Sequence, residues 1–237
     1  MPVARLRPIS SHIAAVDLHG RFQVAAFFVR HEEGLILVDS GFPGWAYAIL
    51  TAARSLPEPN RITDLILTHV HADHMGGAAE IVRQTGARVW CSTAERRYFE
   101  GRRLARDARG WLARLTLGLH ELTVARQAER VVVDETLEEG DRLGPLRVVG
   151  LPGHTPGQIG LVHEADGVCL CGDAFFNADG RIGLDPVPGL TADRARARLS
   201  LQRLLDLGVD DIVPSHGGAL LGDARARLQE FLGTGEG

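Results

Sequence analysis

Apolar positions in the first ninety residues follow the pattern of a sheet. Residues 22–30 and 35–39 are rich in apolar and β-favouring side chains, and the sequence HEEG at 31–34 fits a hairpin turn between them. Short apolar runs at 64–68 and 87–91 are typical of buried strands. The first forty residues as a whole are therefore predicted to be strands.

Helical spacing of apolar positions alternates with these strands. It predicts a helix at 45–56, which ends before Pro57, and a second helix at 75–85, which ends at Gly86. The same patterns continue in the second half of the chain. They predict strands at 146–150, 159–163, 168–171 and 211–214, helices at 192–207 and 223–232, and a loop rich in Gly and Pro at 177–189.

Residues 94–130 differ from the rest of the chain. Between Glu95 and Arg114 there are seven arginines and three acidic residues, and glycines interrupt a helix-favouring context. Two or three amphipathic helices are predicted here. The apolar residues Trp111, Leu112 and Leu115 recur at helical spacing. The helix face that they form is therefore expected to be buried against another part of the protein. A solvated helical layer and a lid over a site both remain open, and the solvated layer is the commoner outcome for a charge run.

The mixture of strands and helices in both halves predicts a layered α/β protein. No internal repeat and no linker divides the sequence. We therefore predict a single domain over residues 1–237, with a helical insertion at about 94–130.

The composition fits a globular protein and excludes reactions that depend on lysine. The chain has 237 residues, 45% of them hydrophobic and 24% charged, with a formal net charge of −4. All 26 basic residues are arginine. Without lysine, a lysine Schiff base and a P-loop lysine are both excluded. The slightly acidic balance argues against non-specific binding of nucleic acid.

The compartment is inferred from the cysteines and from the start of the chain. Cys91, Cys169 and Cys171 are too few for a disulfide framework and fit a reducing compartment. No apolar run approaches the roughly 20 residues of a membrane span, and the first residues lack the apolar stretch of a secretory signal. A cytoplasmic protein that does not bind membranes is expected.

The segment THVHADHMGG at 68–77 is the strongest chemical signal. Within six residues it holds His69, His71, Asp73 and His74, directly after a predicted strand and before a predicted helix. His69 and His71 lie two apart in an extended stretch and can share one ion, and the following turn can aim Asp73 and His74 at a second. Imidazole and carboxylate are ligands of zinc, iron and manganese. Asp73 could instead be only a helix N-cap.

Three later residues stand in the same context, each at the end of a strand and beside glycine. They are His154 in LPGHTPG, Asp173 in CGD and His216 in PSHGG. Singly each is weak, but the shared placement predicts that they meet at one edge of the sheets.

These motifs resemble the metallo-β-lactamase superfamily. Residues 69–74 match its HxHxDH signature, and His154, Asp173 and His216 follow in the order of its remaining ligands. Residues 38–41 (VDSG) resemble its early VDTG-type turn, and the resemblance runs from about residue 13 to 218. It implies a four-layer αββα sandwich with metals at one edge of the two sheets.

The resemblance also implies a role for each ligand. His69, His71 and His154 would hold one metal, Asp73, His74 and His216 the other, and Asp173 would bridge them. Asp39 would orient a ligand from behind. Two ions, most simply zinc and alternatively iron or manganese, would generate a metal-bound hydroxide that attacks an electrophile.

At several positions the sequence departs from the residues that similar enzymes carry, and these differences narrow the range of expected substrates. Tyrosine, which similar lactonases carry three residues after the bridging aspartate, is Phe176 here, and Gln158 stands where relatives commonly have histidine. Zinc β-lactamases commonly use cysteine in place of Asp173. The short segment after His216 and the absence of lysine put glutathione thioesters in doubt.

The expected activity is therefore a dinuclear metal hydrolase acting on an ester, thioester or lactone carbonyl of a small molecule. A persulfide dioxygenase-like iron enzyme and a phosphodiesterase are the alternatives, and a degenerate, binding-only member is the least favoured. Trp111, Phe175 and Phe176 are predicted to line an apolar pocket, and a homodimer is left open.

Overall fold

The computed structural model describes residues 3–19, 23–99, 107–123, 128–185 and 188–234. The chain forms two compact units, one of residues 1–101 with 122–137 and one of residues 102–121 with 138–237.

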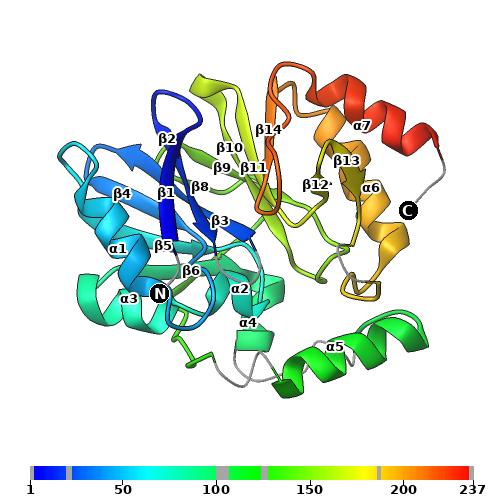
Figure 1. Ribbon diagram of the computed structural model, residues 1–237, viewed down its shortest axis with the longest axis horizontal. Helices are drawn as coiled ribbons and strands as arrows, with labels where there is room; N and C mark the ends of the chain where they lie inside the picture. Colours follow the sequence, from blue (N-terminus) through cyan, green and yellow to red (C-terminus); the bar gives the residue numbers. More distant parts are fainter. Residues whose placement is uncertain (1–2, 20–22, 100–106, 124–127, 186–187, 235–237) are drawn as a thin grey trace. The chain divides into compact units, whose positions relative to one another are not determined.

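A seven-stranded sheet forms the centre of the first unit (Figure 1). Its strands follow the chain order, antiparallel from β1 to β4 and parallel from β4 to β7. The strands are β1 (Val3–Pro8), β2 (Ile13–His19), β3 (Gln23–His31), β4 (Gly34–Val38), β5 (Ile62–Leu67), β6 (Arg88–Ser92) and β7 (Glu135–Leu137).

Helices α1 (Ala46–Arg54) and α3 (Ala78–Thr85) pack against one face of this sheet. Ile49 of α1 and Ile81 of α3 are fully buried among side chains such as Phe28 and Leu65 of the strands. Burial of these apolar side chains supplies the main stabilisation of the unit. The helix predicted at 45–56 and the strand predicted at 64–68 are both confirmed, with ends shifted by a few residues.

The predicted helix at 75–85 is in fact two helices. A short helix α2 (Ala72–Met75) precedes α3, and Gly76 and Gly77 separate them. A Cβ at Gly76 would overlap Pro43, and one at Gly77 would overlap the carbonyl oxygen of Ser40. The two glycines therefore let this segment pass directly against the turn after β4, a close approach that helical periodicity does not reveal.

The second unit is built on a five-stranded sheet in the order β14-β11-β10-β9-β8. All its pairings are antiparallel except the parallel pair of β11 and β14. The strands are β8 (Arg142–Leu143), β9 (Leu146–Gly150), β10 (Ile159–His163), β11 (Val168–Gly172) and β14 (Asp211–Pro214).

Two helices at the end of the chain, α6 (Arg194–Leu205) and α7 (Ala224–Gly233), cover one face of this sheet. Leu201 of α6 and Leu228 of α7 are buried in the same cluster as Cys169 and Ile212 of the strands. Helix α6 begins where the Asp193 side chain accepts a hydrogen bond from the backbone N–H of Arg196. Each of these helices was predicted from the sequence.

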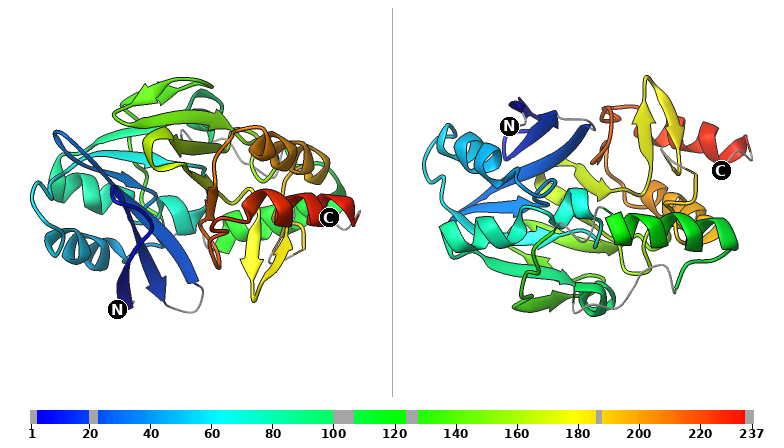
Figure 2. Two further views of the ribbon diagram at one scale, coloured as in Figure 1. Left: turned by 90° about the horizontal axis from the view of Figure 1, so that it is seen from above. Right: turned by 60° about the horizontal axis from the view of Figure 1, so that its bottom comes forward.

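A hairpin of β12 (Phe176–Ala178) and β13 (Arg181–Gly183) projects from the second unit (Figure 2). The sequence had predicted only a loop at 177–189. Asp179 and Gly180, which connect the strands, both have a positive φ, of 51° and 81°. An Asp-Gly pair is a common hairpin turn, so this dipeptide was the signal that could have predicted the hairpin.

The arginine-rich region contains two helices, α4 (Thr93–Phe99) and α5 (Trp111–Thr123). Parts of the predicted insertion, residues 100–106 and 124–127, lie outside the described residues. Ala113 and Leu117 of α5 are buried, whereas Trp111, Leu115 and Leu119 are more than half exposed. The single-domain assignment stays a prediction.

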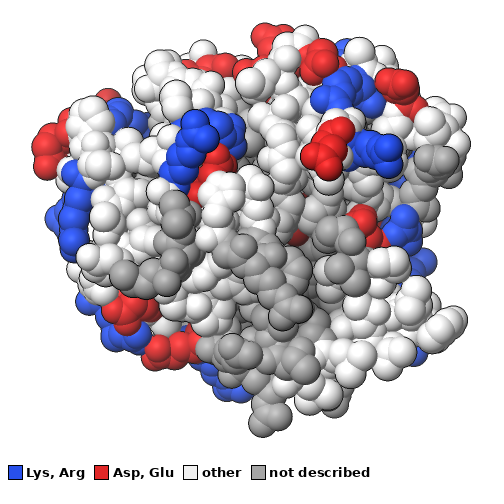
Figure 3. All heavy atoms as spheres, viewed as in Figure 1, with Lys and Arg blue, Asp and Glu red and all other residues white. Residues whose placement is uncertain are grey.

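Many charged side chains on the surface lie beside a residue of opposite charge, as the face drawn in Figure 3 shows. Arg7 donates two hydrogen bonds to Asp17, and Arg142 and Arg147 both contact Glu164. Among the described parts of the chain, no helix is long and apolar enough to cross a membrane.

Two leucines of α6 test how much the second core contributes. Leu201 is fully buried and Leu199 is 59% exposed on the same helix. Leu201→Ala is expected to lower the free energy of unfolding by about 2–5 kcal/mol, because it removes buried surface and leaves a cavity. Leu199→Ala makes the same chemical change at the surface and should cost less than about 0.5 kcal/mol. Denaturant melts of both variants measure the difference, and equal losses would contradict the assigned core.

Candidate metal centre

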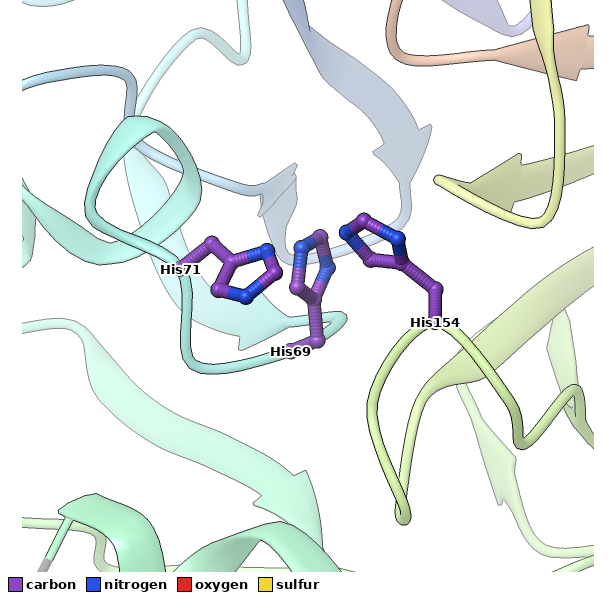
Figure 4. A group of neighbouring side chains, drawn as sticks. All are labelled: His69, His71 and His154. Carbon is purple, nitrogen blue, oxygen red and sulfur yellow. The ribbon is translucent and has the colours of Figure 1, made fainter. Parts of the chain in front are cut away.

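Four of the predicted ligands lie close together in the sequence of the first unit, just after β5. His69 and His71 are on the turn that joins β5 to α2, and Asp73 and His74 are in α2 itself. The rings of His69 and His71 are 4.9 Å apart between centroids (Figure 4), and those of His69 and His74 are 4.0 Å apart. Nε2 of His74 is 3.7 Å from a carboxylate oxygen of Asp73. The structure thus brings these four side chains together.

Asp39 holds this turn from the end of the neighbouring strand. Because β4 and β5 are parallel, their carboxyl ends meet, and Asp39 is placed beside Thr68. Oδ1 of Asp39 accepts hydrogen bonds from the Thr68 backbone N–H at 2.8 Å and from its hydroxyl at 3.0 Å. Oδ2 accepts from the same hydroxyl and pairs with Nδ1 of His74, both at 2.8 Å.

The hydrogen bonds of Asp39 decide which ring nitrogen carries the proton in His69 and in His74. A carboxylate only accepts, so Nδ1 of His74 must be the protonated nitrogen. The Thr68 hydroxyl gives its single proton to Asp39, so its oxygen accepts from Nδ1 of His69, 3.1 Å away. In both rings the lone pair is thereby on Nε2, the nitrogen available to a metal.

Asp73 is not the cap of a helix. The residue at the N-cap of α2 is His71, which makes no side-chain capping bond, and Asp73 is the second residue of the helix. Its side chain is 16% exposed, whereas that of Asp39 is 1% exposed. The capping role that the sequence left open is therefore wrong, and the Asp73 carboxylate faces His74 instead.

Three predicted ligands lie together in the second unit. His154 is on the turn between β9 and β10 (Figure 4), Asp173 follows β11, and His216 follows β14. The parallel pairing of β11 and β14 brings the last two together. Oδ2 of Asp173 is 3.4 Å from Nε2 of His154 and 3.5 Å from Nε2 of His216. A single buried carboxylate is therefore placed between two imidazoles.

Thr191 sets the tautomer of His154. Its hydroxyl donates to the carbonyl oxygen of Leu184 at 2.9 Å, so the same oxygen can only accept from Nδ1 of His154, 3.1 Å away. The lone pair of His154 is again on Nε2, which faces Asp173.

The hairpin that the sequence did not predict holds the loop of His216. The backbone N–H of Asn177 donates to the carbonyl oxygen of His216 at 3.3 Å, and its Nδ2 donates to that of Gly218 at 2.7 Å. The Gly218 N–H returns a bond to the Asn177 carbonyl at 2.9 Å. The ring of Phe176 lies 5.1 Å from that of His216 and 6.0 Å from that of His154.

The three residues predicted to line a pocket are placed very differently. Phe176 borders two of the candidate ligands, as described above. Phe175 is fully buried in the core of the second unit, and Trp111 is 77% exposed on α5. The structure does not bring Phe175 to a surface, and the pocket assignment of Trp111 and Phe176 stays a prediction.

Cys169 and Cys171 are packing residues of the second core. Both are fully buried on β11. Burial raises the pKa of Cys169 to about 12 and raises the pKa of Cys171 well above its ordinary value. Both thiols are therefore protonated at neutral pH and poor nucleophiles.

The donor set of each unit fits a metal ion. The first unit offers three imidazoles and one partly exposed carboxylate, with Nε2 as the lone-pair nitrogen in His69 and His74. The second offers two imidazoles on either side of a carboxylate that is 3% exposed. A histidine that binds a metal through one ring nitrogen usually donates the N–H of the other to a fixed acceptor, as His69, His74 and His154 do here.

Comparison with known proteins identifies the family. The model of the metallo-beta-lactamase superfamily matches residues 19–216, well over half of the chain. This chain belongs to that superfamily. The expected α/β fold of the metallo-β-lactamase type is thereby confirmed, as is the prediction of an enzyme, a metallo-hydrolase of this superfamily.

Relatives of this superfamily enzyme resemble it over different lengths. "Probable metallo-hydrolase YflN" of Bacillus subtilis is 26% identical, over 98% of this chain and 96% of its own length. "Hydroxyacylglutathione hydrolase GloC" of Haemophilus influenzae is 28% identical, over 52% of this chain and 54% of its own. The solved structure of TTHA1623 in a di-iron-bound form is 28% identical with a TM-score of 0.67, covering 95% of this chain and 99% of that one.

Sequence reasoning on this superfamily member missed the residues that orient its ligands. Thr68 precedes the motif directly, and its position could have indicated a role. Thr191 lies 37 residues from His154, and Asn177 lies in a segment expected to be a loop. No local pattern connects either residue to the histidine that it holds.

Gly217 tests the contact between the hairpin and the His216 loop. It has a φ of +85°, and an added Cβ would overlap the carbonyl oxygen of Asn177. Gly217→Ala is expected to lower the free energy of unfolding by clearly more than the roughly 1–2 kcal/mol of an alanine in this backbone region. Gly180→Ala is the matched control, because its φ is +81° and its nearest neighbour is 4.0 Å away. If denaturant melts show equal losses of unfolding free energy in the two variants, the close contact between Gly217 and Asn177 is contradicted.

Proposed function

We propose that the candidate ligands of the two units together bind two divalent metal ions, and that the enzyme hydrolyses an ester, thioester or lactone carbonyl of a small molecule. His69, His71 and His154 would hold one ion and Asp73, His74 and His216 the other, with Asp173 as the bridge. Zinc is the first candidate, because imidazole and carboxylate donors suit it, and iron or manganese would use the same donors.

The observation that carries this proposal is the orientation of the histidines. Three rings from two separate units have Nδ1 committed to a carboxylate or a hydroxyl. Nε2 of His74 lies 3.7 Å from Asp73, and Nε2 of His154 lies 3.4 Å from Asp173. A merely structural histidine has no need of such uniformity. The di-iron-bound form of TTHA1623 supports a centre with two metals in a relative of this enzyme.

The acyl substrate class rests on relatives and on individual residues. Two relatives that match about half of this chain are named hydroxyacylglutathione hydrolases. The compound in that name is a thioester. A carboxylate at Asp173, rather than a cysteine, argues against a β-lactam. Phe176 has no hydroxyl to donate to an oxyanion, which argues against a lactonase that relies on tyrosine at this position.

The residues of the chain divide the work of such a reaction. Bound metal ions would polarise the substrate carbonyl and lower the pKa of a water molecule. Asp39, Thr68 and Thr191 keep the ligand rings in one tautomer and one orientation. Asn177 fixes the backbone of His216, and the Phe176 ring packs beside the rings of His154 and His216.

Substrate contacts and compartment are parts of the same proposal. Trp111, on the exposed side of α5, and Phe176 are the candidates for contact with an acyl chain. The three cysteines are buried and form no disulfide with one another, which supports a reducing compartment such as the cytoplasm.

A substrate panel and metal analysis test the proposal. We expect about two metal ions per chain after growth in metal-replete medium, and hydrolysis of at least one thioester, ester or lactone that stops when a chelator removes the metal and returns with zinc, iron or manganese. Turnover of only a bis(p-nitrophenyl) phosphate probe would favour the phosphodiesterase. Oxygen consumption with a persulfide would favour the dioxygenase, and one metal per chain would contradict the dinuclear centre.

Asp73→Asn distinguishes a ligand from a surface carboxylate. We expect the variant to lose nearly all turnover and one metal ion per chain, because an amide is a poor substitute for a carboxylate ligand. The matched control is Glu80→Gln on α3, where an exposed carboxylate pairs with Arg83. It should keep both activity and metal. An Asp73→Asn enzyme with normal turnover and metal content would refute the assigned role.

A further inference from the structure

Glu95 is a fully buried carboxylate that the proposed mechanism does not use. Its side chain is 0% exposed in the first unit, and its Oε2 accepts a hydrogen bond from the backbone N–H of Val70 at 2.9 Å. Val70 is the residue between His69 and His71. The bond therefore acts on the peptide that connects two candidate ligands.

The start of α4 keeps Glu95 in place. Ser92 ends β6, and its hydroxyl oxygen accepts the backbone N–H of Glu95 at 3.1 Å. Ser92 and Glu95 have the spacing of a capping box, in which a serine side chain fixes the third residue of a helix. Because β6 runs parallel to β5, the start of α4 and the ligand turn follow neighbouring strand ends.

Two buried carboxylates thus hold the backbone on either side of His69. Asp39 accepts the N–H of Thr68 from the end of β4, and Glu95 accepts the N–H of Val70 from the start of α4. A carboxylate in a buried position is costly unless hydrogen bonds compensate it. The presence of Glu95 at this place is more easily explained by control of the turn than by stability.

We propose that Glu95 is a positioning residue that sets the spacing of His69 and His71 for the metal, an inference that rests on the proposed function. It is not assigned as a ligand, because among the described residues Glu95 belongs to none of the groups of His and Asp side chains that lie close enough to share an ion. Removal of the bond frees the peptide between the two histidines, and each metal-binding event must then order it again. Loss of an outer partner of this kind typically weakens metal binding about 10–100-fold.

Four variants separate positioning from stability. Glu95→Ala removes the acceptor, and Glu95→Asp keeps the charge but is one methylene too short to reach Val70. Glu95→Gln keeps an oxygen of the same reach. The control is Asp64→Ala on β5, which removes another buried carboxylate of the unit, the acceptor of the Trp90 indole N–H at 2.8 Å.

Zinc affinity of the apoprotein, measured by competition with a chromophoric chelator, is the main readout. The visible spectrum of the cobalt-loaded protein reports ligand geometry separately. We expect Glu95→Ala and Glu95→Asp to lose about 10–100-fold in zinc affinity and to change the cobalt spectrum. Glu95→Gln should recover most of the affinity. Asp64→Ala should bind zinc like the wild type while it lowers the melting temperature.

Each outcome decides the inference. Wild-type affinity in Glu95→Asp would overturn it, and so would an equal loss in Asp64→Ala, which would make the effect general destabilisation. If Glu95→Ala does not fold, the comparison of the aspartate and glutamine variants decides alone. Failure of the wild-type protein to bind zinc, iron or manganese would instead refute the proposed function, a result distinguishable from a failure confined to Glu95.

Discussion

The carboxylate of Asp39 is the interaction on which the candidate centre depends most. It is wholly buried, and its residue has a φ of +62°, a backbone conformation that is unfavourable for most side chains. From this position it accepts hydrogen bonds from three groups of the first unit: the backbone N–H and the hydroxyl of Thr68, and Nδ1 of His74. The parallel pairing of β4 and β5 makes this arrangement possible. Without this carboxylate, the ligand turn would lose its bond at Thr68 and the tautomers of His69 and His74 would not be fixed.

The second unit reaches the same result by different means. A neutral hydroxyl, that of Thr191, orients His154, and a strand-like backbone pairing with Asn177 holds the loop of His216. Charge is concentrated instead on Asp173, between the two imidazoles. In the first unit a buried carboxylate orients His74 directly and His69 through the Thr68 hydroxyl, whereas the described ligands of the second unit are held by a hydroxyl, a side-chain amide and main-chain hydrogen bonds. In both, the residues that orient the ligands are less recognisable in the sequence than the ligands.

Much of the fold could be predicted because its signals are local. Strands such as β5 and β10 and helices such as α1 and α6 show their period in adjacent residues. The predictions failed where contacts from elsewhere decide the backbone. Gly76 and Gly77 interrupt a helix because the turn after β4 passes beside them, and the β12–β13 hairpin forms beside the His216 loop. Periodicity carries no information about such neighbours.

The sequence by itself determined the residue types of the centre and their placement at strand ends, because metal ligands need particular side chains and strand ends are encoded by nearby residues. It also determined the superfamily. Only the tertiary structure decided which nitrogen of His69, His74 and His154 carries the proton and which carboxylates hold the turn. The partners are 35 residues apart for Asp39 and His74, 37 for His154 and Thr191, and 25 for Val70 and Glu95. Such pairs form only when separate strands and helices pack together, because no local preference of the chain links residues at that separation.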